Sequence, residues 1–101
     1  MKIYEGRRTI DGISVTVDGV PLDARVDLEQ FTDRGFEWTY EGEAPRQLAL
    51  ALIANCLDDT RAHELSQLFM AKVISNLDNE WQLTEDDILH EVELLGGGCV
   101  K

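Results

Sequence analysis

The chain has 101 residues and a mass of 11.4 kDa, enough for one modest hydrophobic core but not for two. Hydrophobic residues make up 44% and charged residues 29%, which excludes collagen-like, low-complexity and wholly disordered chains. Nine Lys and Arg against 20 Asp and Glu give a net charge of −11, so the chain lacks the basic surface that direct nucleic-acid binding needs. We expect a single domain over residues 1–101.

The start of the chain and its cysteine usage predict a cytoplasmic protein without membrane contact. Met1 to Arg7 contain no apolar core of a signal peptide, and the longest apolar run, Leu48 to Ile53, is far shorter than the roughly 20 residues that cross a bilayer. Cys56 and Cys99 are too few for a disulfide framework or a zinc motif. We expect both to be free thiols, Cys56 unreactive within a helix and Cys99 exposed.

The N-terminal part predicts a hairpin. Lys2 to Thr9 and Ile13 to Val17 alternate apolar and polar side chains, and Asp11-Gly12 between them favours a tight turn. Val20 and Pro21 allow a short third strand or a turn back, because Pro has no N–H for further pairing. We expect Leu22 to Gly35 to be extended or irregular.

An aromatic strand and a buried helix are predicted next. Phe36 to Glu41 alternates three aromatic side chains with Glu and Thr, as in a strand whose aromatic face packs into the core. Pro45 suits the first turn of a helix over Ala44 to Leu57. That helix is apolar nearly all round, so we expect it at the centre of the core.

Two further helices are predicted in the C-terminal half. Asp58, Asp59 and Thr60 offer caps for a helix over Arg61 to Leu77, whose apolar stripe packs against the preceding helix. After a short extended piece, Trp81 to Leu83, Thr84 caps a third helix with an acidic first turn and a stripe from Ile88 to Leu95. Gly96 to Gly98 end it, leaving residues 96–101 as a flexible tail. This order predicts an α+β fold, a small N-terminal antiparallel sheet of about three strands packed on three helices.

No pattern in the sequence predicts catalysis, and we expect no catalytic residue, metal or cofactor. His63 and His90 lie on different predicted helices and outside any His-Glu-x-x-His motif. No serine lies in a Gly-x-Ser-x-Gly elbow. The turn before Pro45 is a possible anion site, but Glu41 and Glu43 would repel an anion there.

The acidity allows two interpretations. Six basic and ten acidic residues occur up to Arg46, and three basic and ten acidic after it, so the helical half is more negative. Such a surface can serve solubility alone, or it can complement a basic surface on a partner protein. For the second interpretation the candidate contacts are acidic residues expected on the outside: Asp58, Asp59, Asp86, Asp87, Glu91 and Glu93.

The segment Gly35 to Leu52 reads GFEWTYEGEAPRQLALAL and follows an N-terminal hairpin with Tyr4, Gly6 and either Arg7 or Arg8 in a Tyr-x-Gly-x-Arg pattern. It resembles the signature of a family of small uncharacterised proteins carried by bacteria, archaea and their viruses. The resemblance implies a shared fold and no activity, and the chain departs from that pattern at Thr39, Glu41, Glu43 and Ala44.

We therefore predict a non-catalytic, acidic protein–protein interaction module encoded by a virus or mobile element. In this hypothesis it acts as a nucleic-acid mimic that binds and inhibits a basic nucleic-acid-handling protein of the host. The alternative is a small-ligand-binding or enzymatic domain that uses Trp38, Tyr40, Glu41 and Arg46. A homo-oligomeric structural subunit is a third possibility, and the oligomeric state stays open.

Overall fold

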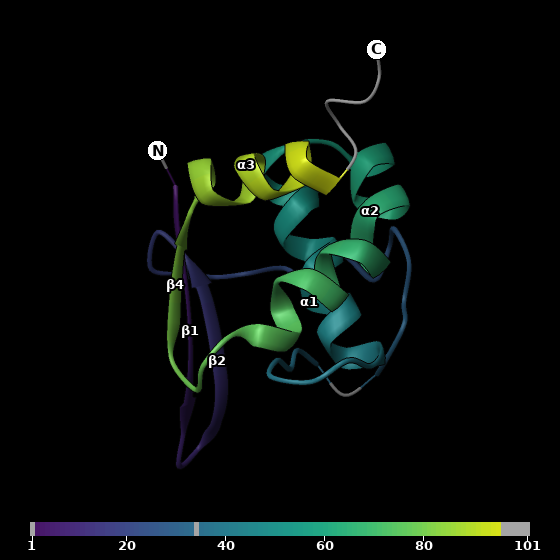
Figure 1. Cartoon of the computed structure of the whole chain (residues 1–101). Coiled ribbons are helices and arrows are strands. Elements are labelled where there is room, and N and C mark those ends of the chain that lie inside the picture. The colour runs from purple at the N-terminus through teal and green to yellow at the C-terminus, as the bar shows by residue number, and fades with distance from the viewer. Residues whose placement is uncertain (1, 34, 96–101) are drawn as a thin grey trace.

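An antiparallel sheet and a layer of helices make up the fold, and the helices cover one face of the sheet (Figure 1). The computed structural model describes residues 2–33 and 35–95. The sheet has four strands in the order β3-β2-β1-β4, namely β1 (Ile3–Thr9), β2 (Gly12–Val17), β3 (Val20–Pro21) and β4 (Trp81–Thr84). The predicted α+β class is confirmed. The sheet also contains β4, which comes from the C-terminal half of the chain and pairs with β1.

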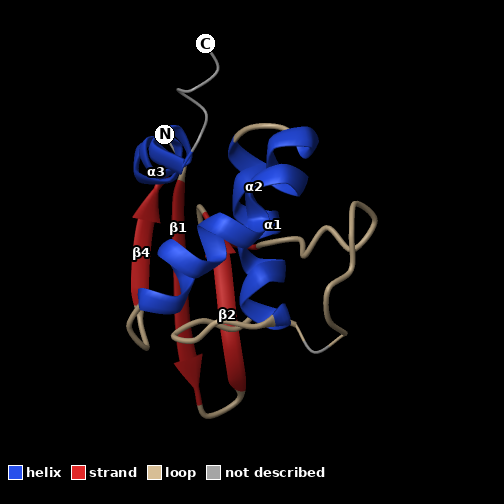
Figure 2. Cartoon of the chain, turned by 45° about the vertical axis from the view of Figure 1, so that its right-hand side comes forward, coloured by secondary structure: helices blue, strands red, loops and turns tan. Residues whose placement is uncertain are grey.

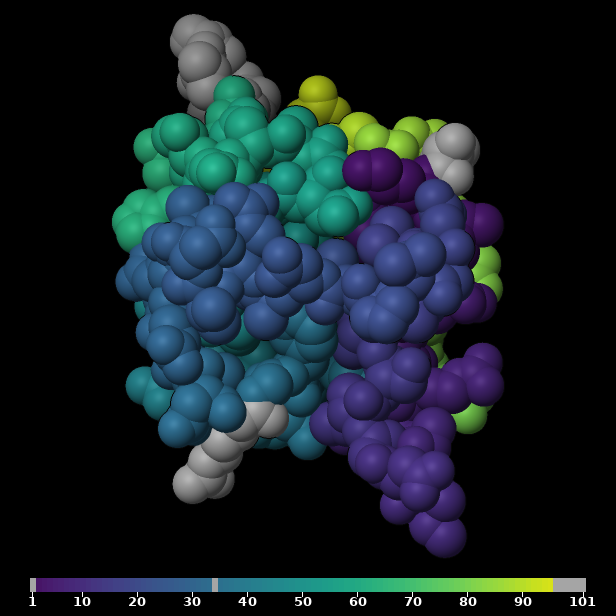
Figure 3. Space-filling model, turned by 180° about the vertical axis from the view of Figure 1, so that it is seen from behind, coloured from purple at the N-terminus to yellow at the C-terminus, as the bar shows by residue number. Residues whose placement is uncertain are grey.

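The predicted hairpin is confirmed. Tyr4 lies opposite Val17 in the β1–β2 register, and Thr9 lies opposite Gly12. Gly12 has a φ of 121°, which a side chain would disfavour, and the Thr9 hydroxyl donates a 2.8 Å hydrogen bond to its carbonyl. The end of the hairpin, with Ile10 fully exposed, projects beyond the rest of the molecule (Figure 3).

Two indole rings pack where the sheet meets the helices. The ring of Trp81 lies directly against the backbone of Gly6, in the space that a Cβ atom at Gly6 would occupy. Trp38 meets Trp81 edge to face, with ring centroids 5.7 Å apart and an interplanar angle of 88°. The absence of a side chain at Gly6 therefore lets this pair join the core.

The helical layer contains α1 (Glu43–Cys56), α2 (Asp59–Lys72), a short 3-10 turn η1 (Ile74–Asn76) and α3 (Glu85–Leu95). The predicted central role of α1 is confirmed, because its side chains are buried continuously from Leu48 to Ile53 and Pro45 lies in its first turn. Within the described residues, no helix combines the length and apolarity needed to cross a bilayer.

The helix predicted over Arg61 to Leu77 is shorter than expected. The structure ends α2 at Lys72 and continues as a 3-10 turn. The Ser75 hydroxyl donates to the Ala71 carbonyl at 2.7 Å, and the Asn76 amide donates to the Lys72 carbonyl at 2.8 Å. These side chains satisfy carbonyls that further helical N–H groups would otherwise bond, so the helix terminates there.

The strand predicted over Phe36 to Glu41 is wrong. Thr39 has a φ of 79°, which interrupts the extended backbone and with it the alternation of faces. As a result Trp38 is completely buried, whereas Tyr40 is 49% exposed. The expected core position is therefore observed for Trp38 and not for Tyr40.

The irregular segment predicted between the sheet and α1 is confirmed for residues 22–33, which run along the side of the helical layer away from the sheet (Figure 2). Gln47 of α1 holds this segment and is only 1% exposed. Its Oε1 accepts from the Phe31 N–H at 2.7 Å, and its Nε2 donates to the carbonyls of Ala24 at 2.7 Å and Glu29 at 2.9 Å. One buried amide thus replaces the hydrogen bonds that a regular element would have supplied.

Candidate functional site

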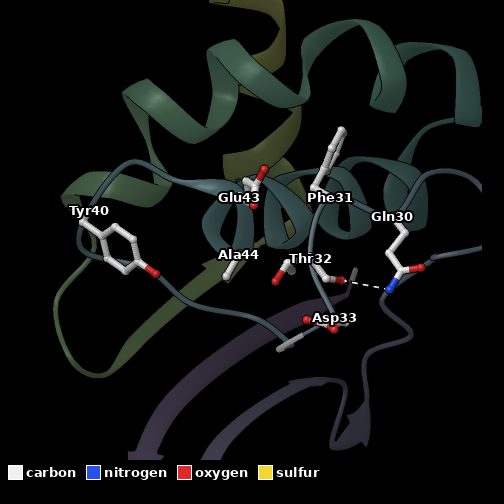
Figure 4. A pocket seen from close by; sticks show the side chains of 7 residues that line it. All are labelled: Gln30, Phe31, Thr32, Asp33, Tyr40, Glu43 and Ala44. Carbon is white, nitrogen blue, oxygen red and sulfur yellow. Dashed lines mark hydrogen bonds between the residues drawn. The ribbon is translucent and has the colours of Figure 1, made fainter.

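A depression of about 580 Å³ lies beside the start of α1 (Figure 4). Tyr40 lines it from one side and the segment from Gln30 to Asp33 from the other, with Glu43 and Ala44 of α1 between them. The Gln30 side chain donates to the Thr32 carbonyl at 3.3 Å. Because Asp33 and Glu43 are its charged lining residues among those described, the depression suits cationic or hydroxyl-rich molecules better than phosphates.

A second depression, of about 340 Å³, lies on the other side of the α1 start and contains Glu41 and Arg46. The Arg46 Nε donates to the Ser66 hydroxyl at 3.0 Å, and its guanidinium carbon lies 4.1 Å from the centroid of the Phe31 ring. The Arg46 guanidinium is therefore engaged in contacts within the fold, with a buried hydroxyl and an aromatic ring.

Only two of the four residues of the predicted small-ligand site, Glu41 and Arg46, line the same depression. Tyr40 lines the first depression, and Glu41 and Arg46 line the second. Trp38 is part of the core and lies in neither of these depressions. Its inclusion in a ligand site followed from the wrong strand assignment.

Arg8 is an organising residue that the sequence analysis missed. Its Nη1 lies 2.9 Å from the Glu37 Oε1, its Nη2 donates to the Trp38 carbonyl at 3.0 Å, and its guanidinium lies 4.6 Å from the Trp38 ring centroid. The side chain fixes the loop before α1 to the end of β1. The available signal was the N-terminal Tyr-x-Gly-x-Arg pattern, which left Arg7 and Arg8 as alternatives.

The two acidic candidates at the start of α2 have structural partners. Asp58 is the N-cap, and its Oδ1 accepts from the Arg61 N–H at 2.7 Å. Asp59 lies 3.2 Å from the Arg25 guanidinium of the 22–33 segment. Local caps and ion pairs of this kind account for both carboxylates without a binding partner.

Of the four acidic candidates on α3, Asp87 caps the helix and Glu91 is partly buried. Asp87 and Thr84 form a capping box, in which the Asp87 N–H donates to the Thr84 hydroxyl at 3.1 Å and the Thr84 N–H donates to the Asp87 carboxylate at 2.9 Å. Glu91 was expected on the outside but is half-buried, and one of its carboxylate oxygens is buried without a hydrogen-bond partner in the described chain. The reason is that Glu91 lies on the side of α3 next to its buried residues, Ile88 and Val92.

The remaining acidic candidates, Asp86 and Glu93, are exposed and lie on one side of α3. They border a groove of about 510 Å³ that we call the α2–α3 groove, which is lined by Leu57, Arg61, Asp86, Leu89, His90, Val92 and Glu93. Of the six predicted contacts, Asp86 and Glu93 are the two that line this groove.

Polar groups meet at the end of α1. The Tyr4 hydroxyl donates to the Asn55 Oδ1 at 2.7 Å, and the Lys2 ammonium donates to the Asn55 carbonyl at 3.0 Å. Burial raises the pKa of Tyr4 and raises the pKa of the neighbouring Cys56 thiol to about 11. A thiol that stays protonated is a poor nucleophile. Cys56 is a free thiol as predicted, and Cys99 lies outside the described residues.

Over residues 2–33 and 35–95, no three His, Cys, Asp or Glu side chains gather closely enough to hold a metal ion. His63 contacts the Glu29 carboxylate at 2.6 Å, which ties α2 to the 22–33 segment. His90 lines the α2–α3 groove. The two histidines are therefore on different parts of the molecule.

The fold and these sites define a small α+β protein in which surface depressions flank a central helix. The chain belongs to a family of unknown function, DUF6166, whose model matches residues 4–94. The match includes the hairpin, both depressions at the start of α1 and the groove-lining side chains. No curated protein and no solved structure matches the chain significantly.

Proposed function

We propose that the chain is a non-catalytic protein-binding module whose acidic α3 engages a basic surface of a partner. The observation that carries the proposal is the charge of α3, which has five carboxylates and no Lys or Arg between Glu85 and Leu95. The carboxylates of Asp86 and Glu93 make no ion pair or hydrogen bond within the described chain, so their charge is available to a partner.

The placement of these charges supports a role beyond folding. The first-turn acids of α3 are favourable beside the positive end of the helix dipole. Glu93 lies in the last turn, where a carboxylate meets the negative end and destabilises a helix by about 0.3–1 kcal/mol. A charge that opposes folding is consistent with selection for binding. Since the net charge is −11, a nucleic-acid-binding surface is the kind of partner surface that fits it.

The test is affinity capture from a lysate of the native host, at low and at high salt, with mass spectrometry of the retained proteins. The wild-type chain is compared with Asp86→Lys/Glu93→Lys and with Asp78→Lys/Glu80→Lys, which makes the same charge change at exposed residues before β4. We expect a basic protein that elutes with salt, retained by the wild type and the control and lost by the α3 variant. Equal loss in both variants, or no basic protein retained, would refute the proposal.

The depression beside Tyr40 favours a second candidate, a site for a small cationic or hydroxyl-rich ligand. A thermal-shift screen tests it, because a ligand at 100 times its Kd adds about 2.7 kcal/mol to the stability. A hit belongs to this site if Tyr40→Ala abolishes the shift. A hit that persists in that variant, or no hit among such compounds, contradicts the second candidate.

A further inference from the structure

The α2–α3 groove has an apolar floor. Val92 is 2% exposed and belongs to the core, and Leu89 beside it is half-buried. Leu57, at the end of α1, adds an exposed apolar side chain to the same groove. Leu57 and Leu89 therefore give a partner apolar contact in addition to charge, which the depressions at the start of α1 do not offer to the same degree.

One wall of the groove is acidic. Asp86, His90 and Glu93 follow each other at spacings of four and three residues, so they share one side of α3. Asp86 and Glu93 are seven residues apart, which places their backbones about 10.5 Å apart along the helix. No Lys or Arg within α3 offsets this wall.

The opposite wall contains a cation. Arg61 lies in the first turn of α2, and its backbone N–H is bonded to the Asp58 cap. Its guanidinium makes no ion pair within the described part of the chain. The groove therefore favours positive charge along α3 and disfavours it along α2.

We propose, building on the protein-binding function above, that the α2–α3 groove binds one amphipathic helix of about three turns from a partner protein. The apolar side of this helix packs on Leu57 and Leu89, and its Lys or Arg residues lie against Asp86 and Glu93. The side of the partner helix that faces Arg61 is neutral or acidic. Electrostatic complementarity thus sets the rotation of the bound helix about its own axis.

The spacing of the acidic wall favours a helix over an extended strand. A helix that packs along α3 repeats a side chain on the same face every seven residues, about 10.5 Å, which matches Asp86 and Glu93. Side chains on the same face of a strand repeat about every 6.8 Å, so the nearest strand spacings are about 6.8 and 13.5 Å. Neither of them matches the roughly 10.5 Å between Asp86 and Glu93. The 11 residues of α3 span about 16 Å, the length of a three-turn partner.

The experiment compares three synthetic probes by isothermal titration calorimetry against the full chain. The first is an amphipathic helical peptide of about three turns with Leu on one side and Lys on one flank. The second has the same composition in scrambled order, and the third is poly-lysine. We expect the amphipathic peptide to bind at least about tenfold more tightly than the scrambled one and to gain helical circular dichroism on binding.

Variants locate the bound peptide. Leu57→Ser and Asp86→Lys should each weaken the amphipathic peptide, whereas Asp78→Lys, with the same charge change outside the groove, should leave its affinity nearly unchanged. Arg61→Ala keeps the backbone N–H that donates a hydrogen bond to Asp58, so the helix cap is retained. Because the variant loses a positive charge in the groove, it should bind poly-lysine more tightly. An increase in affinity on removal of a side chain is not expected from a structural defect.

The outcomes separate the two proposals. Equal binding of ordered and scrambled peptides, weakened alike by Asp86→Lys and Asp78→Lys, overturns the groove and leaves the acidic binding module in place. Tight binding without a gain of helical signal overturns the helical occupant. Absence of binding by all three probes overturns the groove, and the lysate capture then decides the module separately.

Discussion

Replacement of Gln47 by leucine tests how the loop before α1 is held. The change keeps a similar side-chain volume but removes three hydrogen bonds, one accepted from Phe31 and two donated to Ala24 and Glu29. A neutral hydrogen bond contributes about 1 kcal/mol net, so the three together contribute about 3 kcal/mol. The apolar side chain offsets part of this if the site stays dry, which leaves an expected loss of about 2–3 kcal/mol.

Urea unfolding followed by tryptophan fluorescence measures this loss as a lower midpoint at unchanged slope. For a domain of this size the same loss lowers the melting temperature by roughly 10–20 °C. Hydrogen exchange adds a local readout, because the Phe31 amide loses its acceptor and should exchange faster. Gln67→Leu, an exposed glutamine on α2, is the matched control and should change neither quantity. The reasoning is wrong if the two variants have the same midpoint or if Phe31 protection persists.

Three further predictions concern other contacts. Gly6→Ala places a methyl group where the Trp81 ring lies, so we expect a loss of about 1–3 kcal/mol and a shifted fluorescence maximum; an unchanged melting curve contradicts this packing. Thr84→Ala removes the α3 cap and should cost about 1 kcal/mol in thermal unfolding, with recovery in Thr84→Ser; equal stability of all three chains contradicts the cap. Burial raises the pKa of Cys56 from 9.0 to about 11, so the thiol is less ionised than an ordinary thiol until the pH reaches that value. In a Cys99→Ser chain, alkylation at pH 9 should therefore be about fifty-fold slower than in urea, and the two rates should converge toward pH 11; equal rates at pH 9 contradict the burial.

Local signals predicted the elements whose contacts are short in sequence. The Asp11-Gly12 turn, the apolar run of α1 and the Thr84 cap each depend on side chains within a few residues. Their structures follow from turn geometry, periodicity and capping, which one sequence is sufficient to show.

The error at Phe36 to Glu41 has a long-range cause. An alternating aromatic pattern is typical of a strand, yet Arg8 binds the segment from 29 and 30 residues away and Thr39 adopts a positive φ. Neither the contacts of Arg8 nor the positive φ of Thr39 leaves a periodic pattern in the sequence. The tertiary environment therefore overrides the β propensity of these residues.

The binding candidates were predictable as a set of charges but not as a surface. Successive residues of an α-helix are rotated by about 100° about its axis. Asp86 and Glu93 therefore lie on the same side of α3, whereas Asp87 and Glu91 lie on another side. This part could have been predicted from the α3 periodicity alone. The meeting of α3 with Leu57 and Arg61 depends on how three helices pack, and the sequence carries no local sign of it.

The position of β1 between β2 and β4 has a consequence for biosynthesis. Ile3 pairs with Thr84, so β1 acquires its second neighbour only after Thr84 has been made. The hairpin and the α1–α2 pair can form early on the ribosome, whereas Trp81 reaches its place against Gly6 late. Until then the nascent sheet exposes one edge of β1, and a pairing partner from another chain would compete with β4 for it.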